Sequence, residues 1–161
     1  MSQESKTSRA AETSNPNRAA DLSGMVCAIT GGTRGIGRAI AEAYLAAGAS
    51  VAINGRSEDK GQQAIREMGS TERTLFIPGD VTHQADVEGF IAQTINKFGK
   101  IDVLVNNAGG SSGFAPVAEL SDDAWQQASA WILHSAFWAT RAALNDMLTV
   151  SYTHLTLPTK A

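Results

Sequence analysis

A glycine-rich stretch, residues 30–37, carries the residue types that can hold a phosphate group. It contains Gly31, Gly35 and Gly37, follows a short apolar run, and opens a segment with helical apolar spacing. Glycines let a turn approach a bulky ligand closely, and the free N–H groups and positive dipole end of a following helix favour an anion. The stretch therefore predicts a pyrophosphate-binding turn between a strand and a helix.

Three further segments with polar residues follow predicted strands. They are residues 54–56, Asp80 and residues 106–109. Because ligands of parallel sheets bind beyond the carboxyl ends of the strands, these segments and the glycine turn are expected to converge on one crevice. This convergence is stronger evidence than the glycines alone, whose spacing differs from the Gly-x-Gly-x-x-Gly pattern.

The elements that must position these residues alternate between strand and helix. Strands are expected at residues 26–30, 50–54, 74–77 and 101–105, and helices at 35–47, 58–68, 84–98 and 122–148. Ser57, Thr82 and Ser121 are predicted N-caps. The pattern predicts an α/β fold, a doubly wound parallel sheet of about four or five strands between two helical layers. The last helix is expected to bury one apolar stripe, formed by Trp125, Ala128, Ile132, Ala136, Ala139, Ala143 and Met147.

Composition limits the function classes. The 161 residues are 43% apolar, which is enough for one domain with a core, and no apolar run is long enough to span a membrane. The net charge of −3 argues against a nucleic-acid surface, and the three scattered histidines show no metal-ligand spacing. The single cysteine, Cys27, is expected to be a small buried hydrophobe in a reducing cytoplasm. Residues 1–20 are expected to form a disordered tail.

Taken together, these motifs resemble the short-chain dehydrogenase/reductase (SDR) family, and most closely its 3-oxoacyl-carrier-protein-reductase-like members. The resemblance rests on residues 30–37 and 106–109, on Asp80-Val81, and on Trp125 followed by residues 140–144, and it covers about residues 22–148. It implies a Rossmann sheet at residues 21–148 and an NAD(P)(H)-dependent oxidoreductase that acts on a small carbonyl or alcohol substrate. It also implies a dimer or tetramer in which the long helix pairs with its partner subunit. Trp131 and Trp138, expected to be exposed on this helix, could serve that contact, and the alternative is that they pack in the core.

The residues at the strand ends favour NADP(H) over NAD(H). A carboxylate after the second strand would bond the ribose 2′-hydroxyl of NAD, but this chain has Asn54 there, with Arg56 and Arg34 nearby to face a 2′-phosphate. The resemblance implies that Asp80 and Val81 contact adenine, that Asn106 and Ala108 lie along the adenosine ribose, and that Gly109 lets the loop pass close by. The alternatives are solvated arginines and an ordinary strand-ending turn. The predicted cofactor-binding residues are Gly31, Thr33, Arg34, Gly35, Ile36, Gly37, Asn54, Arg56, Asp80, Val81, Asn106, Ala108 and Gly109.

A second motif, residues 109–113, fits the Gly-x-Ser-x-Gly nucleophile elbow of α/β-hydrolases. That elbow needs a helix immediately afterwards, and here Phe114-Ala115-Pro116 follows. A mobile loop over the substrate side is the better interpretation.

The catalytic residues of the family are not assigned in this chain. The family pairs a tyrosine with a lysine four residues later, which stabilises the phenolate, but Tyr152 is followed by Thr156 at that spacing. The family's helical asparagine aligns with Ile132, or with Trp131 after a shift of one residue. Neither side chain can relay a proton, and Ile132 is expected to pack in the core.

Residues 149–161 do not follow the family pattern and resemble translated sequencing-adapter DNA. We therefore expect a truncated parent sequence with a foreign end, in which the Ser-Tyr-Lys segment is missing. The alternative is that residues 149–153 form a genuine fifth strand. If the end is native, a non-catalytic NADP(H)-binding or scaffold protein with a degenerate site becomes the better hypothesis, and a fragment without function is the third.

Overall fold

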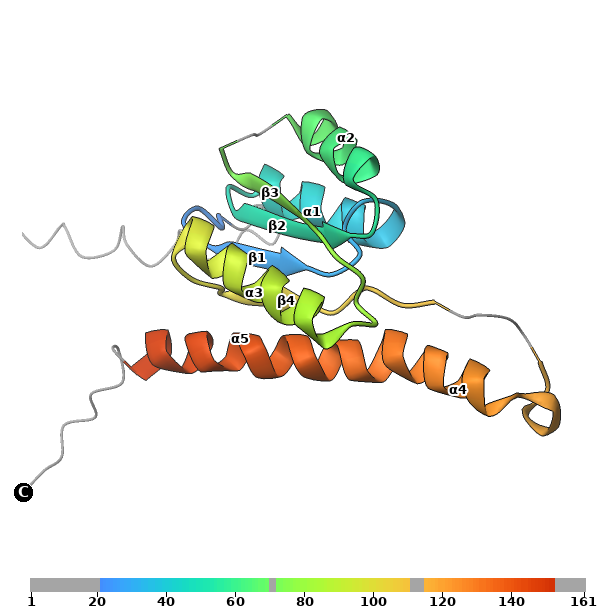
Figure 1. The fold of residues 1–161 in the computed structure, drawn as a ribbon. Helices are drawn as coiled ribbons and strands as arrows, with labels where there is room; N and C mark the ends of the chain where they lie inside the picture. The colour runs from blue at the N-terminus through green and yellow to red at the C-terminus, as the bar shows by residue number, and fades with distance from the viewer. Residues whose placement is uncertain (1–20, 70–71, 111–114, 153–161) are drawn as a thin grey trace, which may run out of the picture.

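Four parallel strands form the sheet that positions the candidate site. The computed structural model describes residues 21–69, 72–110 and 115–152 (Figure 1). The predicted tail, most of the 109–113 motif and residues 153–161 lie outside these ranges. Within the described ranges the strand order is β3-β2-β1-β4, and each neighbouring pair is parallel. The strands are β1 Val26–Ile29, β2 Ser50–Gly55, β3 Thr74–Pro78 and β4 Val103–Val105.

Helices cover both faces of this sheet, which confirms the predicted three-layer arrangement. α1 and α2 pack on one face, and α3 and α5 pack side by side on the other (Figure 1). A short 3₁₀ turn, η1, precedes the last helical run, which consists of α4, a π-helical segment η2, and α5. The bounds are α1 Gly35–Ala46, α2 Glu58–Met68, α3 Gln84–Phe98, η1 Val117–Glu119, α4 Asp122–Ser129, η2 Ala130–His134 and α5 Ser135–Tyr152. None of these helices, within the described residues, is long and apolar enough to cross a membrane.

The two-sided core follows from the alternation of side chains along each strand. Cys27 and Ile29 of β1 face the α1 and α2 layer, whereas Ala28 between them faces α3 and α5. All three are fully buried. Burial raises the pKa of the Cys27 thiol to about 12, so the thiol stays neutral at physiological pH. The prediction that Cys27 is a small buried hydrophobe is therefore confirmed.

Two of the three predicted helix caps are confirmed. The Ser57 hydroxyl accepts a hydrogen bond from the Lys60 N–H, and the Ser121 hydroxyl accepts one from the Ala124 N–H. The prediction for Thr82 is wrong, since the N-cap position of α3 belongs to His83. The Thr82 hydroxyl instead donates to Asp80 Oδ1 at 2.9 Å, so it orders the turn that leaves β3.

β4 begins two residues later than predicted, at Val103. The Ile101 N–H donates to Asp146 Oδ2 of α5 at 3.0 Å and is not part of the strand ladder. Asp102 Oδ2 accepts the Val26 N–H at 2.8 Å, which ties the start of β4 to the start of β1. The Asp146 bond holds this edge segment against α5, and the Asp102 bond holds it against β1.

The predicted apolar stripe is correct only in the second half of the last helical run. Ala139 and Ala143 are fully buried, but Trp125 is 59% exposed and Ile132 is 58% exposed. Two causes are visible: α4 projects past the sheet (Figure 1), and η2 has wider turns than the 3.6-residue period assumes. The fifth-strand alternative for residues 149–153 is also wrong as far as residue 152, because α5 continues to Tyr152.

Candidate nucleotide-binding site

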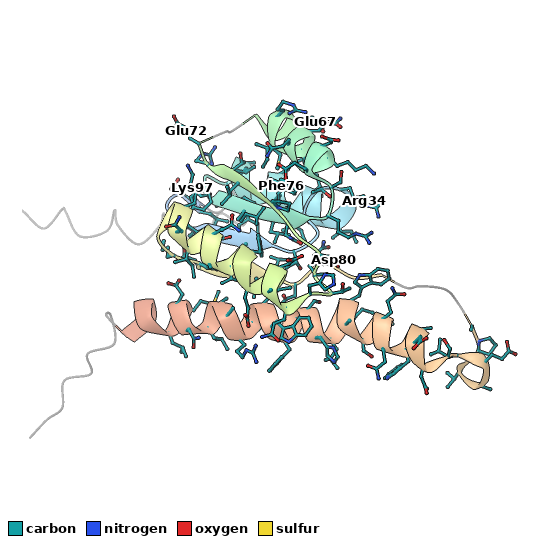
Figure 2. The ribbon with its side chains drawn as sticks, viewed as in Figure 1. Arg34, Glu67, Glu72, Phe76, Asp80 and Lys97 are labelled. Carbon is teal, nitrogen blue, oxygen red and sulfur yellow. The ribbon has the colours of Figure 1, made fainter. Side chains whose placement is uncertain are left out.

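The four segments predicted to converge do lie around one cavity. The cavity has a volume of about 630 Å³ and lies at the carboxyl ends of the strands. Figure 2 shows Arg34 and Asp80 at this end of the sheet, whereas Glu72 and Lys97 lie toward the other end. The lining residues are Gly31, Thr33, Arg34, Gly35, Asn54, Gly55, Arg56, Gly79, Asp80, Val81, Asn107, Ala108, Gly109, Gly110 and Trp131.

The glycine turn has a backbone that other residues would adopt with strain. Gly31 and Gly35 have φ angles of 68° and 57°, in the left-handed region. Gly37 is buried, and a Cβ there would meet the Asn107 side chain and the Gly31 carbonyl. Ile36 is 76% exposed and, like Gly37, does not line the cavity. Gly37 therefore shapes the turn, while Ile36 faces solvent.

Asn107 joins this turn to the end of β4. Its Nδ2 donates to the carbonyl oxygens of Thr30 and Gly31, both at 3.0 Å. In return, the Thr30 hydroxyl accepts the N–H groups of Asn107 and Ala108, both at 3.1 Å. These reciprocal hydrogen bonds hold together the glycine turn and the segment after β4, which both line the cavity.

The prediction placed Asn106 in the site and left Asn107 out. In the structure Asn106 is exposed, does not line the cavity, and donates through Nδ2 to Thr140 Oγ1 of α5 at 3.2 Å. The sequence signal for Asn107 was present, because two consecutive asparagines follow an apolar strand. Successive residues point in different directions there, so only one of the two can reach the glycine turn.

Asn54 lines the cavity, but its side-chain amide makes hydrogen bonds to backbone groups of β3 and of the turn after it. It is 2% exposed, and its Nδ2 donates to the carbonyls of Ile77 and Gly79, both at 3.2 Å. The backbone carbonyl of Asn54 accepts a hydrogen bond from the Gly32 N–H. β2 runs one residue further than predicted, so the last residue of the strand is Gly55 and not Asn54.

Gly55 leaves space at the end of β2. A Cβ there would lie 2.7 Å from the Thr33 Cγ2 atom of the glycine turn. A side chain at this position would therefore project against the turn, and its absence keeps that part of the cavity free. Arg56, which follows β2, and Arg34 of the glycine turn line the same cavity, and β2 itself ends without a carboxylate.

Asp80 is the single acidic residue among the described residues that line the cavity. Its Oδ1 accepts the N–H and the hydroxyl of Thr82, and its own N–H donates to Asp86 Oδ2. Burial raises the pKa of Asp80, but the two Thr82 bonds and the positive charge of Arg56 outweigh it, and the net pKa lies below the ordinary value. Asp80 is therefore a carboxylate at neutral pH.

The π-helical segment η2 decides which side chain faces this cavity. Trp131 is half-buried, lines the cavity, and has the Arg56 Cζ atom 6.0 Å from its ring centroid. Trp138 is also half-buried, so each tryptophan lies between the expected exposure and the alternative of core packing. The expected core packing of Ile132 is wrong, because its side chain is exposed beside Gly109.

The cavity fits an extended ligand that carries phosphate groups. Its volume lies in the usual range for cofactor sites, and the residues that line it include the glycine turn, the start of α1 and two arginines. The strand order reverses direction between β1 and β4, where such sheets bind nucleotides. The fold and the glycine turn together define a Rossmann-type nucleotide-binding protein.

Comparison with known proteins identifies the family. A sequence model described as short chain dehydrogenase matches residues 25–154. The chain therefore belongs to the short-chain dehydrogenase family, which is a family of oxidoreductases.

Individual relatives agree with this assignment. The chain is 35% identical over 126 residues to 3beta-hydroxysteroid dehydrogenase 2 of Eggerthella lenta, a match that covers 76% of this chain and 48% of the relative. The crystal structure of an SDR glucose/ribitol dehydrogenase from Brucella melitensis is similar, with a TM-score of 0.76, 31% identity, and coverage of 80% of this chain and 54% of that one.

A blue fluorescent protein from a metagenomic library, solved in complex with NADPH, is similar as well. Its TM-score is 0.74 at 32% identity, over 79% of this chain and 53% of that one. The chain thus spans about half the length of these relatives.

Proposed function

We propose that residues 21–148 bind NADP(H), as the dinucleotide-binding unit of a cytoplasmic oxidoreductase that acts on a small carbonyl or alcohol compound. The observation that carries the proposal is the end of β2. There the strand stops at Gly55, and Arg34 and Arg56 line the adjoining cavity. Guanidinium groups make charge-assisted bidentate bonds to a phosphate, whereas a carboxylate at this position would repel it.

Each part of the cavity would hold a different part of the dinucleotide. The N–H groups of the glycine turn and the start of α1 would hold the pyrophosphate, and Arg34 and Arg56 the 2′-phosphate. Asp80 and Val81 would contact the adenine, and Ala108 and Gly109 the ribose. When bound, NADPH supplies a hydride to a carbonyl carbon. The NADPH complex of the blue fluorescent protein supports the choice of cofactor.

The first test is a direct titration of the whole chain with NADPH and NADH. We expect NADPH to bind at least about tenfold more tightly, which corresponds to roughly 1.4 kcal/mol from the 2′-phosphate contacts. Isothermal titration calorimetry at fixed ionic strength measures both dissociation constants, since charge contacts weaken with salt. Equal affinity, or tighter binding of NADH, contradicts the proposed preference.

A non-catalytic NADP(H)-binding protein is the second candidate. One observation favours it: Ile132 places an exposed aliphatic side chain beside Gly109. Consumption of bound NADPH in the presence of ketones would separate the two functions, because the second candidate binds without turnover. We propose that the family's Ser-Tyr-Lys set belongs to the parent protein and that residues 149–161 are foreign.

We also propose that the parent is a dimer or tetramer that pairs through its last helical run. The support is a set of apolar side chains that are 43% exposed or more. It consists of Trp125, Ile132, Leu133, Phe137, Leu144 and Leu148. Such a row of exposed apolar residues is characteristic of a protein interface, and sedimentation velocity of the chain measures self-association directly.

A further inference from the structure

Trp131 lies between the core and the candidate cofactor cavity. One part of the side chain packs against the small apolar cluster of Val81, Val87 and Ala139. Another part lines the cavity, where a Cβ on Gly110 would lie 3.2 Å from the Trp131 Cε3 atom. An indole placed in this way has one surface supported by protein and another available to a ligand.

The side chain of Arg56 lies over the ring of Trp131. Its guanidinium carbon is 6.0 Å from the ring centre, and both residues line the same cavity. The side chain of Arg56 is exposed, and no ion pair holds its charge among the described residues. The cation and the ring therefore face each other across a space next to Val81 and Asp80.

We propose that Trp131 is a base-stacking residue, whose indole ring packs against the adenine of NADP(H) while Arg56 covers the other face of the base. This inference rests on the proposed function and adds to it a residue that recognises the base. Planar groups pack about 3.5 Å apart, so a base between the two groups needs a separation of roughly 7 Å. The exposed Arg56 side chain supplies the missing distance of about 1 Å by a change of rotamer.

A purely structural role for Trp131 predicts that replacing it has the same effect on ligand binding as replacing Trp138. Both indoles are half-buried and pack against the same apolar cluster, but Trp138 does not line the cavity. Trp138 is therefore a matched control within the same helical run. A change that affects binding at Trp131 and not at Trp138 comes from the cavity and not from the shared core.

The test uses 2′,5′-ADP, which keeps the adenine and the 2′-phosphate and lacks the nicotinamide half. We expect Trp131→Leu to weaken binding of both 2′,5′-ADP and NADPH about tenfold, since base stacking on an aromatic ring has effects of this size. Trp131→Phe retains a ring, so its affinity should stay within about threefold of the unmodified chain. Trp138→Leu should bind both probes as the unmodified chain does.

A fluorescence measurement keeps the inference testable if Trp131→Leu does not fold. With Trp125→Phe and Trp138→Phe, Trp131 is the sole indole of the chain, and 2′,5′-ADP should quench its emission in proportion to the bound fraction. Calorimetric binding without quenching overturns the role of Trp131 and leaves the proposed function standing. A folded Trp131→Leu variant with unchanged affinity does the same. If the unmodified chain binds neither probe, the proposed function and this inference both fall.

Discussion

Replacement of Gly55 with aspartate is expected to lower the affinity for NADPH about a hundredfold without a comparable loss of affinity for NADH. A Cβ at position 55 would point toward Thr33 of the glycine turn, in the cavity that Arg34 and Arg56 line. A carboxylate there would repel a 2′-phosphate and would accept a hydrogen bond from the free 2′-hydroxyl of NADH. Titration of the variant with both dinucleotides measures the switch in preference.

Gly55→Asn is the matched control for this prediction. It adds a side chain of the same shape, so it meets Thr33 in the same way, but it carries no charge. We expect only a small loss of NADPH affinity in this variant. If Gly55→Asp and Gly55→Asn weaken NADPH equally, the effect is steric, and the proposed position of the 2′-phosphate is wrong.

Replacement of Asn107 with alanine should have the second large effect, on stability. The substitution removes both bonds from Nδ2 to the carbonyls of Thr30 and Gly31, in a region that is partly buried. Two lost hydrogen bonds with acceptors left poorly satisfied cost about 2–4 kcal/mol of unfolding free energy. Urea denaturation followed by circular dichroism should show a midpoint lowered by about 1 M or more.

Asn106→Ala provides the comparison, because it changes the same residue type one position earlier. Asn106 makes a single exposed bond to Thr140, so its loss should cost less than about 1 kcal/mol. Similar midpoints for the two variants would contradict the role of Asn107 in joining β4 to the glycine turn. NADPH affinity should also fall more in Asn107→Ala, since the turn that binds the pyrophosphate loses its support.

The strands and helices could be predicted because their signals are local. Apolar runs bounded by turn residues place β1 to β3 within one residue at each end, and α2 and α3 have the predicted bounds. Ser57 and Ser121 cap helices through bonds to backbone groups three residues away, which depend on no distant contact. The parallel sheet then follows from the alternation of these elements.

The errors occur where a carboxylate outside the predicted element competes with its local pattern. Thr82 is the predicted cap of α3, but its hydroxyl donates to Asp80, two residues earlier, in the turn that leaves β3. The Ile101 N–H could extend β4, but Asp146 of α5 accepts its hydrogen bond. In both cases a carboxylate forms a stronger, charge-assisted bond than the one that the local pattern predicts.

The same distinction, between features set by the local sequence and features set by tertiary contacts, applies to the candidate site. By itself the sequence determined the glycine turn, the two arginines and the convergence of four strand ends, because glycine content, charge and alternation are properties of short segments. Only the tertiary structure decided that Gly55 ends β2, that Asn107 and not Asn106 reaches the turn, and that Trp131 and not Ile132 faces the cavity. Each of these depends on one residue of register or on one wide helical turn. A shift of one residue, or one wide helical turn, changes the direction in which a side chain points. Packing between segments distant in the sequence determines which of these directions the folded protein adopts.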